Sequence, residues 1–326
     1  MSAGAPATRS PASPALVWAG LITLYLVWGS TYLGIKVAVG SIPPFLMGAL
    51  RFIPSGLVLA CVIAFRARAT IRRPTFIQLR DTAIVGTFLL LGGMGMVAWG
   101  EQTVPSGIAA LMIALMPMWL AVFGRTVFGD RLPLMGWLGV VIGIVGVAIL
   151  AWPVGGVAAL DPGGMRTLIA SPILWSVGTL YSAKKAIRPA PVLFATGLEL
   201  VAGGFALLIA AAVTGEIGGF SWSAVSTDSW LGLGYLSVVG SLVGYTTFAW
   251  LLTVAPLARL STYAYVNPVV AIVLGAIILG EPLSPRTGVA AIVIVAAVVL
   301  IVTARGRASR VEVQAEADAG TPLVEV

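Results

Sequence analysis

Long apolar runs constrain this chain more than any other feature of its sequence. The first extends from Ala15 to Val37, and similar runs follow it toward the end of the chain. A helix needs about 20 apolar residues to cross a hydrocarbon layer of about 30 Å, because each residue adds about 1.5 Å. Since 59% of the residues are hydrophobic and only 10% are charged, polar side chains could not cover these runs in water. The sequence therefore predicts an all-α polytopic membrane protein.

Ten apolar runs are bounded by charged residues, proline or glycine. The expected transmembrane helices are residues 15–38, 43–65, 82–100, 105–124, 132–152, 165–184, 190–213, 230–254, 260–280 and 287–304. The first run follows Arg9 and resembles the start of a signal peptide, but it is too long for one and many runs follow it. We therefore expect an uncleaved first helix.

Basic residues are concentrated in alternate loops between these runs. Fifteen of the 19 Lys and Arg lie there: Arg9, Arg66, Arg68, Arg72, Arg73, Arg80, Arg125, Arg131, Lys184, Lys185, Arg188, Arg259, Arg305, Arg307 and Arg310. By the positive-inside rule these loops face the cytoplasm, which predicts a multi-pass protein of the cytoplasmic (inner) membrane with both termini cytoplasmic. The opposite loops contain mainly Asp161, Glu216 and Asp228. This alternation fits an even number of spans.

The two halves of the chain resemble each other at a period of about 150 residues. At an offset of 151 the matches include Ala98 with Ala249, Trp99 with Trp250, Pro105 with Pro256, Pro117 with Pro268, Gly124 with Gly275 and Gly129 with Gly280. At an offset of 148, Gly56 matches Gly204, and Trp28 falls one residue from Trp175. We expect two five-helix repeats at 15–152 and 165–304, with disordered cytoplasmic segments at 1–14 and 305–326.

Five is an odd number of spans, so the second repeat enters the membrane in the opposite sense to the first. Two inverted five-helix repeats are the arrangement from which alternating access is made, with a site near the midplane exposed to either side in turn. The repeat therefore favours a ten-helix transporter over a membrane sensor or an enzyme.

Several segments resemble one transporter family. They are WGSTYLGIK (28–36), Pro43 and Pro44, LRF (50–52), VPSGIAAL (104–111), YAYVNPVVAIVLG (263–275), and Gly280 with Glu281. Together they are similar to the EamA branch of the drug/metabolite transporter superfamily, closest to its YedA-like permeases. The likeness extends from the first predicted helix to the tenth.

This resemblance implies a ten-helix basket with both termini inside. The central cavity would be lined chiefly by the first, third, fourth, sixth, eighth and ninth helices. It also implies export of amino acids or other small metabolites, but substrates across the family are diverse, so the resemblance indicates the class of mechanism and not the cargo.

Charged residues inside apolar runs are functional candidates, because each costs at least about 2.5 to 3.5 kcal/mol to insert. Arg51 and Glu199 lie at similar estimated depths near the midplane and are equivalent in the repeat, at an offset of 148. They are predicted to form a gate or a proton-coupled switch, with two alternatives: a fixed ion pair, or separate partners if their helices never meet. Lys36 and Glu101 lie near the outer ends of their helices, where either snorkelling to the headgroups or a role at the cavity mouth is expected.

Aromatic and polar residues inside the runs are the candidates for substrate binding. They are Trp28, Tyr32, Trp99, Trp175, Tyr263 and Asn267. Flat rings and an amide in a water-filled cavity would bind an amphiphilic small molecule, and the rings would also accept an ammonium group. The alternative is that the aromatic residues form interfacial belts and that the amide joins helices.

Pro117 and Pro268 occupy matching places within two predicted helices. Each removes a backbone hydrogen bond, which favours either a hinge or a fixed kink. The small-residue stripe Gly136, Gly139, Gly143 and Gly146 favours close helix packing or the face of a homodimer.

Several functions are excluded by what the sequence lacks. There is no phosphate-binding G-x-x-x-x-G-K-[ST] loop, no His, and Cys61 is the single Cys. ATP hydrolysis by that loop, zinc sites and Ser-His or Cys-His dyads are therefore not expected, and no catalytic residue, metal or cofactor is predicted. The net charge of +7 follows from the loop arginines and does not indicate nucleic acid.

The sequence as a whole predicts a secondary transporter that exports small metabolites or drugs by alternating access, with a small-molecule substrate and the lipid bilayer as partners. Proton coupling through Glu199 or Glu101 is one expectation. The alternatives are an uncoupled facilitative transporter and a channel-like pore, while an intramembrane enzyme is a poor second because no pair of embedded carboxylates offers acid–base chemistry.

Overall fold

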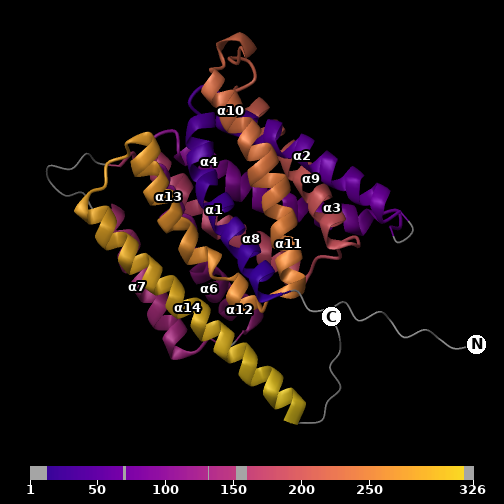
Figure 1. The fold of residues 1–326 in the computed structure, drawn as a ribbon, viewed down its shortest axis with the longest axis vertical. Coiled ribbons are helices and arrows are strands. Elements are labelled where there is room, and N and C mark those ends of the chain that lie inside the picture. Colours follow the sequence, from indigo (N-terminus) through magenta and orange to yellow (C-terminus); the bar gives the residue numbers. More distant parts are fainter. Residues whose placement is uncertain (1–12, 69–70, 131, 152–159, 319–326) are drawn as a thin grey trace, which may run out of the picture.

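The computed structural model describes residues 13–68, 71–130, 132–151 and 160–318, and in these residues it contains helices and no strand (Figure 1). The elements are α1 (Pro14–Ala38), α2 (Pro44–Arg66), α3 (Phe76–Gly86), η1 (Thr87–Gly95), α4 (Met96–Gly100), α5 (Ser106–Ile113), α6 (Met116–Phe128), α7 (Leu134–Ala151), α8 (Pro162–Lys184), α9 (Val192–Val213), η2 (Trp222–Ala224), α10 (Thr227–Tyr235), η3 (Leu236–Val243), α11 (Gly244–Val254), α12 (Leu257–Leu260), α13 (Tyr263–Leu279) and α14 (Pro285–Asp318). The all-helical prediction is confirmed for the described chain.

Seven helical stretches of the described chain are long and apolar enough to cross a membrane. They are Pro14–Ala38, Pro44–Arg66, Phe76–Gly100, Ser106–Phe128, Val192–Val213, Thr227–Val254 and Pro285–Ala304. The apolar helices Leu134–Leu150 and Tyr263–Leu279 are shorter, and α8 has 23 residues but is less apolar and carries Arg166. Each of the ten predicted runs therefore contains helix, and the multi-pass character is confirmed.

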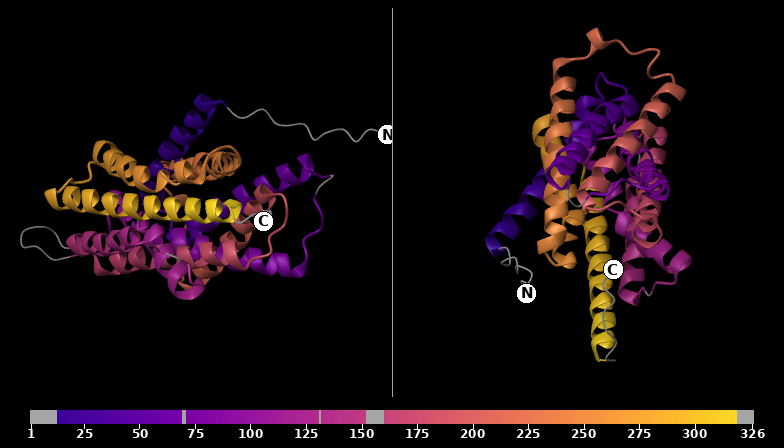
Figure 2. Two further views of the ribbon diagram at one scale, coloured as in Figure 1. Left: turned by 90° about the horizontal axis from the view of Figure 1, so that it is seen from below. Right: turned by 90° about the vertical axis from the view of Figure 1, so that its right-hand side faces the viewer.

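Two helices differ from the sequence-based prediction, one by a break and one by its end. The run 105–124 is broken into α5 and α6, because Pro117 in the first turn of α6 cannot donate the hydrogen bond that would join them. The last helix continues to Asp318, since the residues after 304 are mostly helix formers such as Ala, Arg, Glu and Gln. At 34 residues α14 is about 51 Å long, and its C-terminal part projects beyond the bundle (Figure 2). Residues 1–12 and 319–326 of the predicted disordered ends lie outside the described residues.

Wide helical turns with π-type bonding occur at equivalent places in the two halves. η1 (Thr87–Gly95) interrupts the third predicted span and η3 (Leu236–Val243) the eighth, at an offset of about 149. η1 contains three glycines in nine residues, which lowers the cost of leaving regular α-helix, whereas η3 contains only Gly240. Such segments are frequent at functional sites.

Hydrogen bonds among loops and helix ends divide the loops into two sets, one at each end of the bundle. At the end that we call the Ser41 end, the joined pairs are Ser41 with Ser226, Thr103 with Asp161, Leu46 with Glu216, and Ser106 with Glu281. At the other, the Asp81 end, they are Asp81 with Ile187, Gln78 with Arg188, and Lys184 with Asp130. Each set holds alternate loops, so successive helical stretches run in opposite directions.

The helices pack as pairs that join distant parts of the sequence. α2 packs along α9, α7 along α14, and α1 against α10, α11 and α13. The stripe Gly136, Gly139, Gly143 and Gly146 lies in the α7–α14 contact, where Ile301 lies against Gly139 and Ile294 against Gly146. The stripe thus serves helix packing, the first of its two predicted uses.

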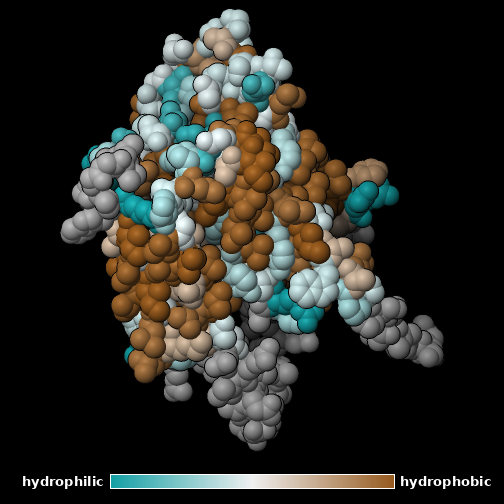
Figure 3. Space-filling model, turned by 60° about the vertical axis from the view of Figure 1, so that its left-hand side comes forward, coloured by the Kyte–Doolittle hydropathy of each residue, from teal (hydrophilic) through white to brown (hydrophobic). Residues whose placement is uncertain are grey.

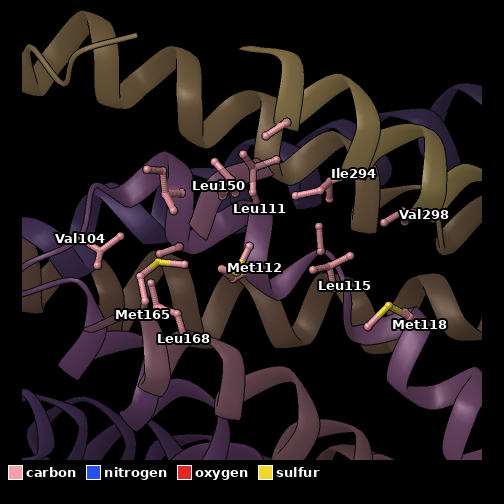
Figure 4. Close-up of a cluster of buried hydrophobic side chains, with 14 of the residues drawn as sticks. Val104, Leu111, Met112, Leu115, Met118, Leu150, Met165, Leu168, Ile294 and Val298 are labelled. Atoms are coloured by element: carbon pink, nitrogen blue, oxygen red, sulfur yellow. The ribbon is translucent and has the colours of Figure 1, made fainter. Parts of the chain in front are cut away.

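A buried cluster of large side chains holds α5 and α6 against α8 and α14. Figure 4 shows Leu111, Met112 and Leu115 pointing toward Leu168 and Ile294 in this cluster. The outer surface is also apolar: Leu134, Leu138, Val141 and Ile144 of α7 are more than half exposed. Figure 3 shows hydrophobic side chains covering much of that side of the molecule, as a lipid-facing surface requires.

Candidate functional site

An aromatic cluster forms where the first and second halves of the chain meet. The Trp28 ring of α1 lies 5.8 Å from Tyr245, 5.1 Å from Phe248 and 5.2 Å from Tyr263, measured between ring centroids. We call these four residues the Trp28 cluster. Trp28 reaches α11 because Gly244 has no side chain there, and a Cβ at Gly244 would collide with the indole. Trp28 and Tyr263 were predicted, whereas Tyr245 and Phe248 were missed.

Polar side chains with unused bonding capacity lie beside this cluster. Asn267 is one helical turn beyond Tyr263 on α13, is 8% exposed, and its side-chain oxygen has no hydrogen-bond partner among the described residues. Tyr32 is one turn beyond Trp28 on α1 and packs against the two buried clusters that contain Ile108 and Ile35. A buried amide without a partner is costly, which makes Asn267 a candidate for contact with a ligand or water.

Arg51 and Glu199 lie on α2 and α9, which pack along each other, but they do not pair. The Arg51 Nε donates to Ser241 Oγ in η3 at 3.0 Å, and the guanidinium lies 4.6 Å from the Phe52 ring centroid. Glu199 instead lies 3.8 Å from Arg188. The structure therefore shows the predicted alternative in which Arg51 and Glu199 have separate partners, although α2 and α9 do pack against each other.

An axial offset between the antiparallel helices separates these two charges. Phe52 and Ile53 lie against Gly204, so Arg51 is level with residues about 205–206 of α9. Glu199 is about six residues away along that helix, or about 9 Å.

Glu101 and Lys36 meet at the Ser41 end, in an unexpected arrangement. The Lys36 ammonium donates to the backbone carbonyls of Glu101 and Val104, at 2.5 and 3.2 Å. It points into the protein, so snorkelling outward does not describe it. The Glu101 side chain is fully buried, and neither of its carboxylate oxygens has a hydrogen-bond partner in the described chain.

Trp175 and Trp99 lie apart from the Trp28 cluster. Trp175 of α8 packs over Gly93 in η1 and belongs to a hydrophobic cluster with Ile35 and Val97. Trp99 lies at the Ser41 end, where its ring is 5.1 Å from that of Phe45.

The two tryptophans nevertheless share an arrangement across the repeat. Trp28 of the first half covers Gly244 of the second, and Trp175 of the second half covers Gly93 of the first. The two glycines are 151 residues apart and the two tryptophans 147. Each half thus packs an indole on a glycine of the other half. Gly93 lies within η1, and Gly244 directly follows η3.

The two predicted hinge prolines are both buried, but their surroundings differ. Pro117 stands at the start of α6, directly after the break from α5, whereas Pro268 lies inside α13. The matching positions in sequence therefore do not give matching breaks in the helices.

Acidic side chains outside the spans fix the loops at the Ser41 end. Hydrogen bonds from the Gly164 N–H at 2.6 Å and from the Thr103 hydroxyl at 2.9 Å hold the pKa of Asp161 below its usual value. Glu216 accepts from the Leu46 N–H at 2.9 Å, yet burial raises the pKa of this carboxyl. No group of three metal-ligating side chains occurs within the residues that the structure describes.

The sequence matches the EamA-like transporter family over residues 15–152 and 163–303. It is 35% identical over 288 residues to the "Uncharacterized inner membrane transporter YedA" of Escherichia coli (strain K12), covering 87% of this chain and 90% of that protein. It is 25% identical over 280 residues to the "Probable amino-acid metabolite efflux pump" of Salmonella typhimurium (strain LT2), covering 84% and 91% of the two chains.

A solved crystal structure of a protein 21% identical to this chain has a similar fold. The TM-score is 0.59, with 90% of this chain and 99% of that chain covered. The family and the two relatives are named as transporters or as an efflux pump.

Proposed function

Because this chain belongs to the EamA-like transporter family, we propose that it is a secondary transporter that exports small metabolites or drugs across the cytoplasmic membrane by alternating access. The observation that carries the proposal is the Trp28 cluster, which is built from α1 of the first half and α11 and α13 of the second. A site made from both halves changes shape when the halves move against each other. Family membership implies a small-molecule substrate and contact with membrane lipid.

We propose that ten helical stretches cross the membrane as two inverted five-helix repeats, at 15–152 and 165–304. The alternate loops gathered at the Ser41 and Asp81 ends support this topology, as does the match of the family to two successive segments. The basic loops lie at the Asp81 end, so this end faces the cytoplasm and both termini are cytoplasmic.

The conformation described here is proposed to be the one closed toward the outside. Ile35, Ile42, Val97 and Leu236 at the Ser41 end are at most 1% exposed and form one cluster. The tyrosines nearer the Asp81 end, including Tyr263, are only partly buried. Substrate would enter the Trp28 cluster from the Asp81 end, and the Ser41 end would open to release it.

The side chains around the Trp28 cluster suit an amphiphilic molecule with an apolar body and a polar group. Four rings offer apolar faces, and the Asn267 side-chain oxygen offers an unused acceptor. The name of the Salmonella typhimurium relative extends the candidates to amino acids and related metabolites. Transport of such a compound is the function that we propose.

Proton coupling is proposed to act through Glu101 in preference to Glu199. Glu101 is fully buried with both carboxylate oxygens unpartnered among the described residues, whereas Glu199 has Arg188 at 3.8 Å. A fully buried carboxylate that accepts no hydrogen bond is stabilised by taking up a proton, although the Lys36 ammonium beside Glu101 opposes this. Binding and release of a proton at Glu101 would then accompany opening of the Ser41 end.

The test is concentrative uptake into everted membrane vesicles that contain the overproduced protein. Candidate compounds are first selected as toxic amino-acid analogues that cells tolerate better when they overproduce the chain. Accumulation that depends on the proton gradient and fails in Glu101→Gln supports coupled export. Equilibration without accumulation would instead indicate an uncoupled facilitator or a pore.

A further inference from the structure

A hollow at the Ser41 end has features of a second ligand site. It has a volume of about 380 Å³ and lies between the turn that joins α1 to α2, the end of α4 and the end of α9. Its lining includes Ser41, Pro43, Trp99, Gln102 and Glu216. Pockets of about 300 to 1,000 Å³ are typical for small molecules. We call it the Trp99 hollow.

The aromatic wall of the hollow is partly exposed and packs against a neighbouring ring. Trp99 is 37% exposed, although it lies on a helix whose neighbouring residues Ala98 and Gly100 are buried. Its ring packs against Phe45 at 5.1 Å between centroids, with the planes at 47°. Trp99 thus presents part of its indole to the hollow while its ring packs against Phe45.

The carboxylate of Glu216 is held in the same hollow by backbone contacts. It accepts from the N–H groups of Leu46 at 2.9 Å and Phe45 at 3.4 Å, at the start of α2. These two hydrogen bonds occupy only part of the carboxylate's capacity to accept hydrogen bonds, since its two oxygens offer about four acceptor positions. The remaining positions can meet a ligand.

The electrostatics of the hollow favour a cation. No Lys or Arg is among the residues that line it, and the start of α2 supplies partial positive charge beside Glu216. The pKa of Glu216, which lies outside the spans, is raised because burial removes water from the carboxylate. A positively charged group placed here would stabilise the ionised form.

We propose that the Trp99 hollow binds small organic cations of the substituted-ammonium class, with the cationic group between the Trp99 indole and the Glu216 carboxylate. An aromatic face and a carboxylate together recognise an alkylated ammonium group, which has little hydrogen-bonding capacity of its own. This site lies at the Ser41 end and shares no residue with the Trp28 cluster. It therefore does not depend on the proposed transport function.

The test measures binding of choline to the purified full-length protein in a maltoside detergent, by isothermal titration calorimetry. The neutral isostere 3,3-dimethylbutan-1-ol has nearly the same shape and serves as the matched ligand. We expect choline to bind and the alcohol to bind at least about tenfold more weakly, since only the cation gains from the ring face and the carboxylate.

Variants locate the site. Glu216→Gln keeps an oxygen that accepts from Leu46, and Trp99→Leu removes only the aromatic face; each should weaken choline binding about tenfold. Asp228→Asn and Trp222→Leu change an acid and an exposed indole outside the hollow and should bind as the parent does. Absence of choline binding, equal binding of the alcohol, parental affinity in both hollow variants, or loss of binding in Trp28→Ala would each overturn the proposal.

Discussion

Arg51 is a buried charge whose partners are neutral, and this determines how it should respond to substitution. It is 3% exposed, its side chain contacts Ser241 and the Phe52 ring, and no acidic group lies within salt-bridge distance in the described chain. A guanidinium in such surroundings is costly unless water or a ligand reaches it. Its free N–H groups are therefore candidates for contact with the polar part of a substrate.

The separation of Arg51 from Glu199 predicts independent effects. Arg51→Gln and Glu199→Gln should each impair transport or stability, and their effects in the double variant should add to within about 0.5 kcal/mol. Arg188→Gln with Glu199→Gln should be non-additive, because these two charges do face each other. Thermal unfolding of the four purified proteins in each cycle measures this. A large coupling between Arg51 and Glu199 would show that the two side chains meet in another conformation.

Trp28 and Asn267 should be needed for transport and not for insertion into the membrane. Trp28→Ala removes the centre of the aromatic cluster, and Asn267→Ala removes the unused amide. Each is expected to lower the transport rate at least about tenfold, as loss of good substrate contacts does. The matched control is Trp137→Ala, an indole on the exposed face of α7. Normal transport by both central variants would show that these residues are structural.

Which site residues could be predicted depended on what marks them in the sequence. Trp28, Tyr263 and Asn267 are polar or aromatic residues of conspicuous type within apolar runs. Tyr245 and Phe248 were overlooked because they lie in the eighth predicted run, apart from the candidate residues of the first and ninth runs. Their spacing of three, which places both on one helical face, was the available signal. The partner of Arg51 could not be predicted, because the axial offset of α2 and α9 is set by tertiary packing.

At the scale of helices, the apolar runs located the long helices but not η2, α12 or the internal geometry of the helices. The break between α5 and α6 follows from Pro117, a signal that was present in the sequence. The wide turns of η1 and η3 have no such marker in the sequence; in the structure Trp175 packs on Gly93 within η1, and Trp28 packs on Gly244 directly after η3. Composition therefore predicts where a helix lies better than how it is wound.

The contacts between indoles and glycines predict what a single methyl group would do. Gly93→Ala would place its Cβ 2.9 Å from the Trp175 ring, and Gly244→Ala would place one against Trp28. Overpacking of this kind costs about 1 to 3 kcal/mol, so both variants should unfold at lower temperature and transport more slowly. Gly234→Ala, with open space around it, is the control. Trp175→Phe should partly restore Gly93→Ala by making room, and failure of this rescue would show that another contact is limiting.

At the scale of the whole molecule, the proposed topology rests on which loops meet at each end of the bundle and on which loops carry the basic residues. The loops joined at the Asp81 end include those richest in Lys and Arg, and the loops joined at the Ser41 end are poor in them. Reporters fused after Arg73 and after Arg310 should therefore both indicate the cytoplasm. One fused near Asp161 should indicate the periplasm. A cytoplasmic signal near Asp161 would contradict the inverted repeat.

Alternating access requires that the Ser41 end open during each cycle, and a covalent link across that end should prevent it. The Ser41 and Ser226 hydroxyls, in the α1–α2 turn and before α10, are 3.3 Å apart, which is close enough for replacement by a disulfide. In a Cys61→Ala background, Ser41→Cys with Ser226→Cys should lose at least about tenfold in transport when oxidised and recover when reduced. Ser284→Cys with Thr287→Cys, which joins residues of one turn whose hydroxyls are 2.9 Å apart, should leave transport unchanged. If the oxidised Ser41 variant, with its disulfide verified by mass spectrometry, still transports at the reduced rate, the Ser41 end need not open, and a pore or another exit must replace alternating access.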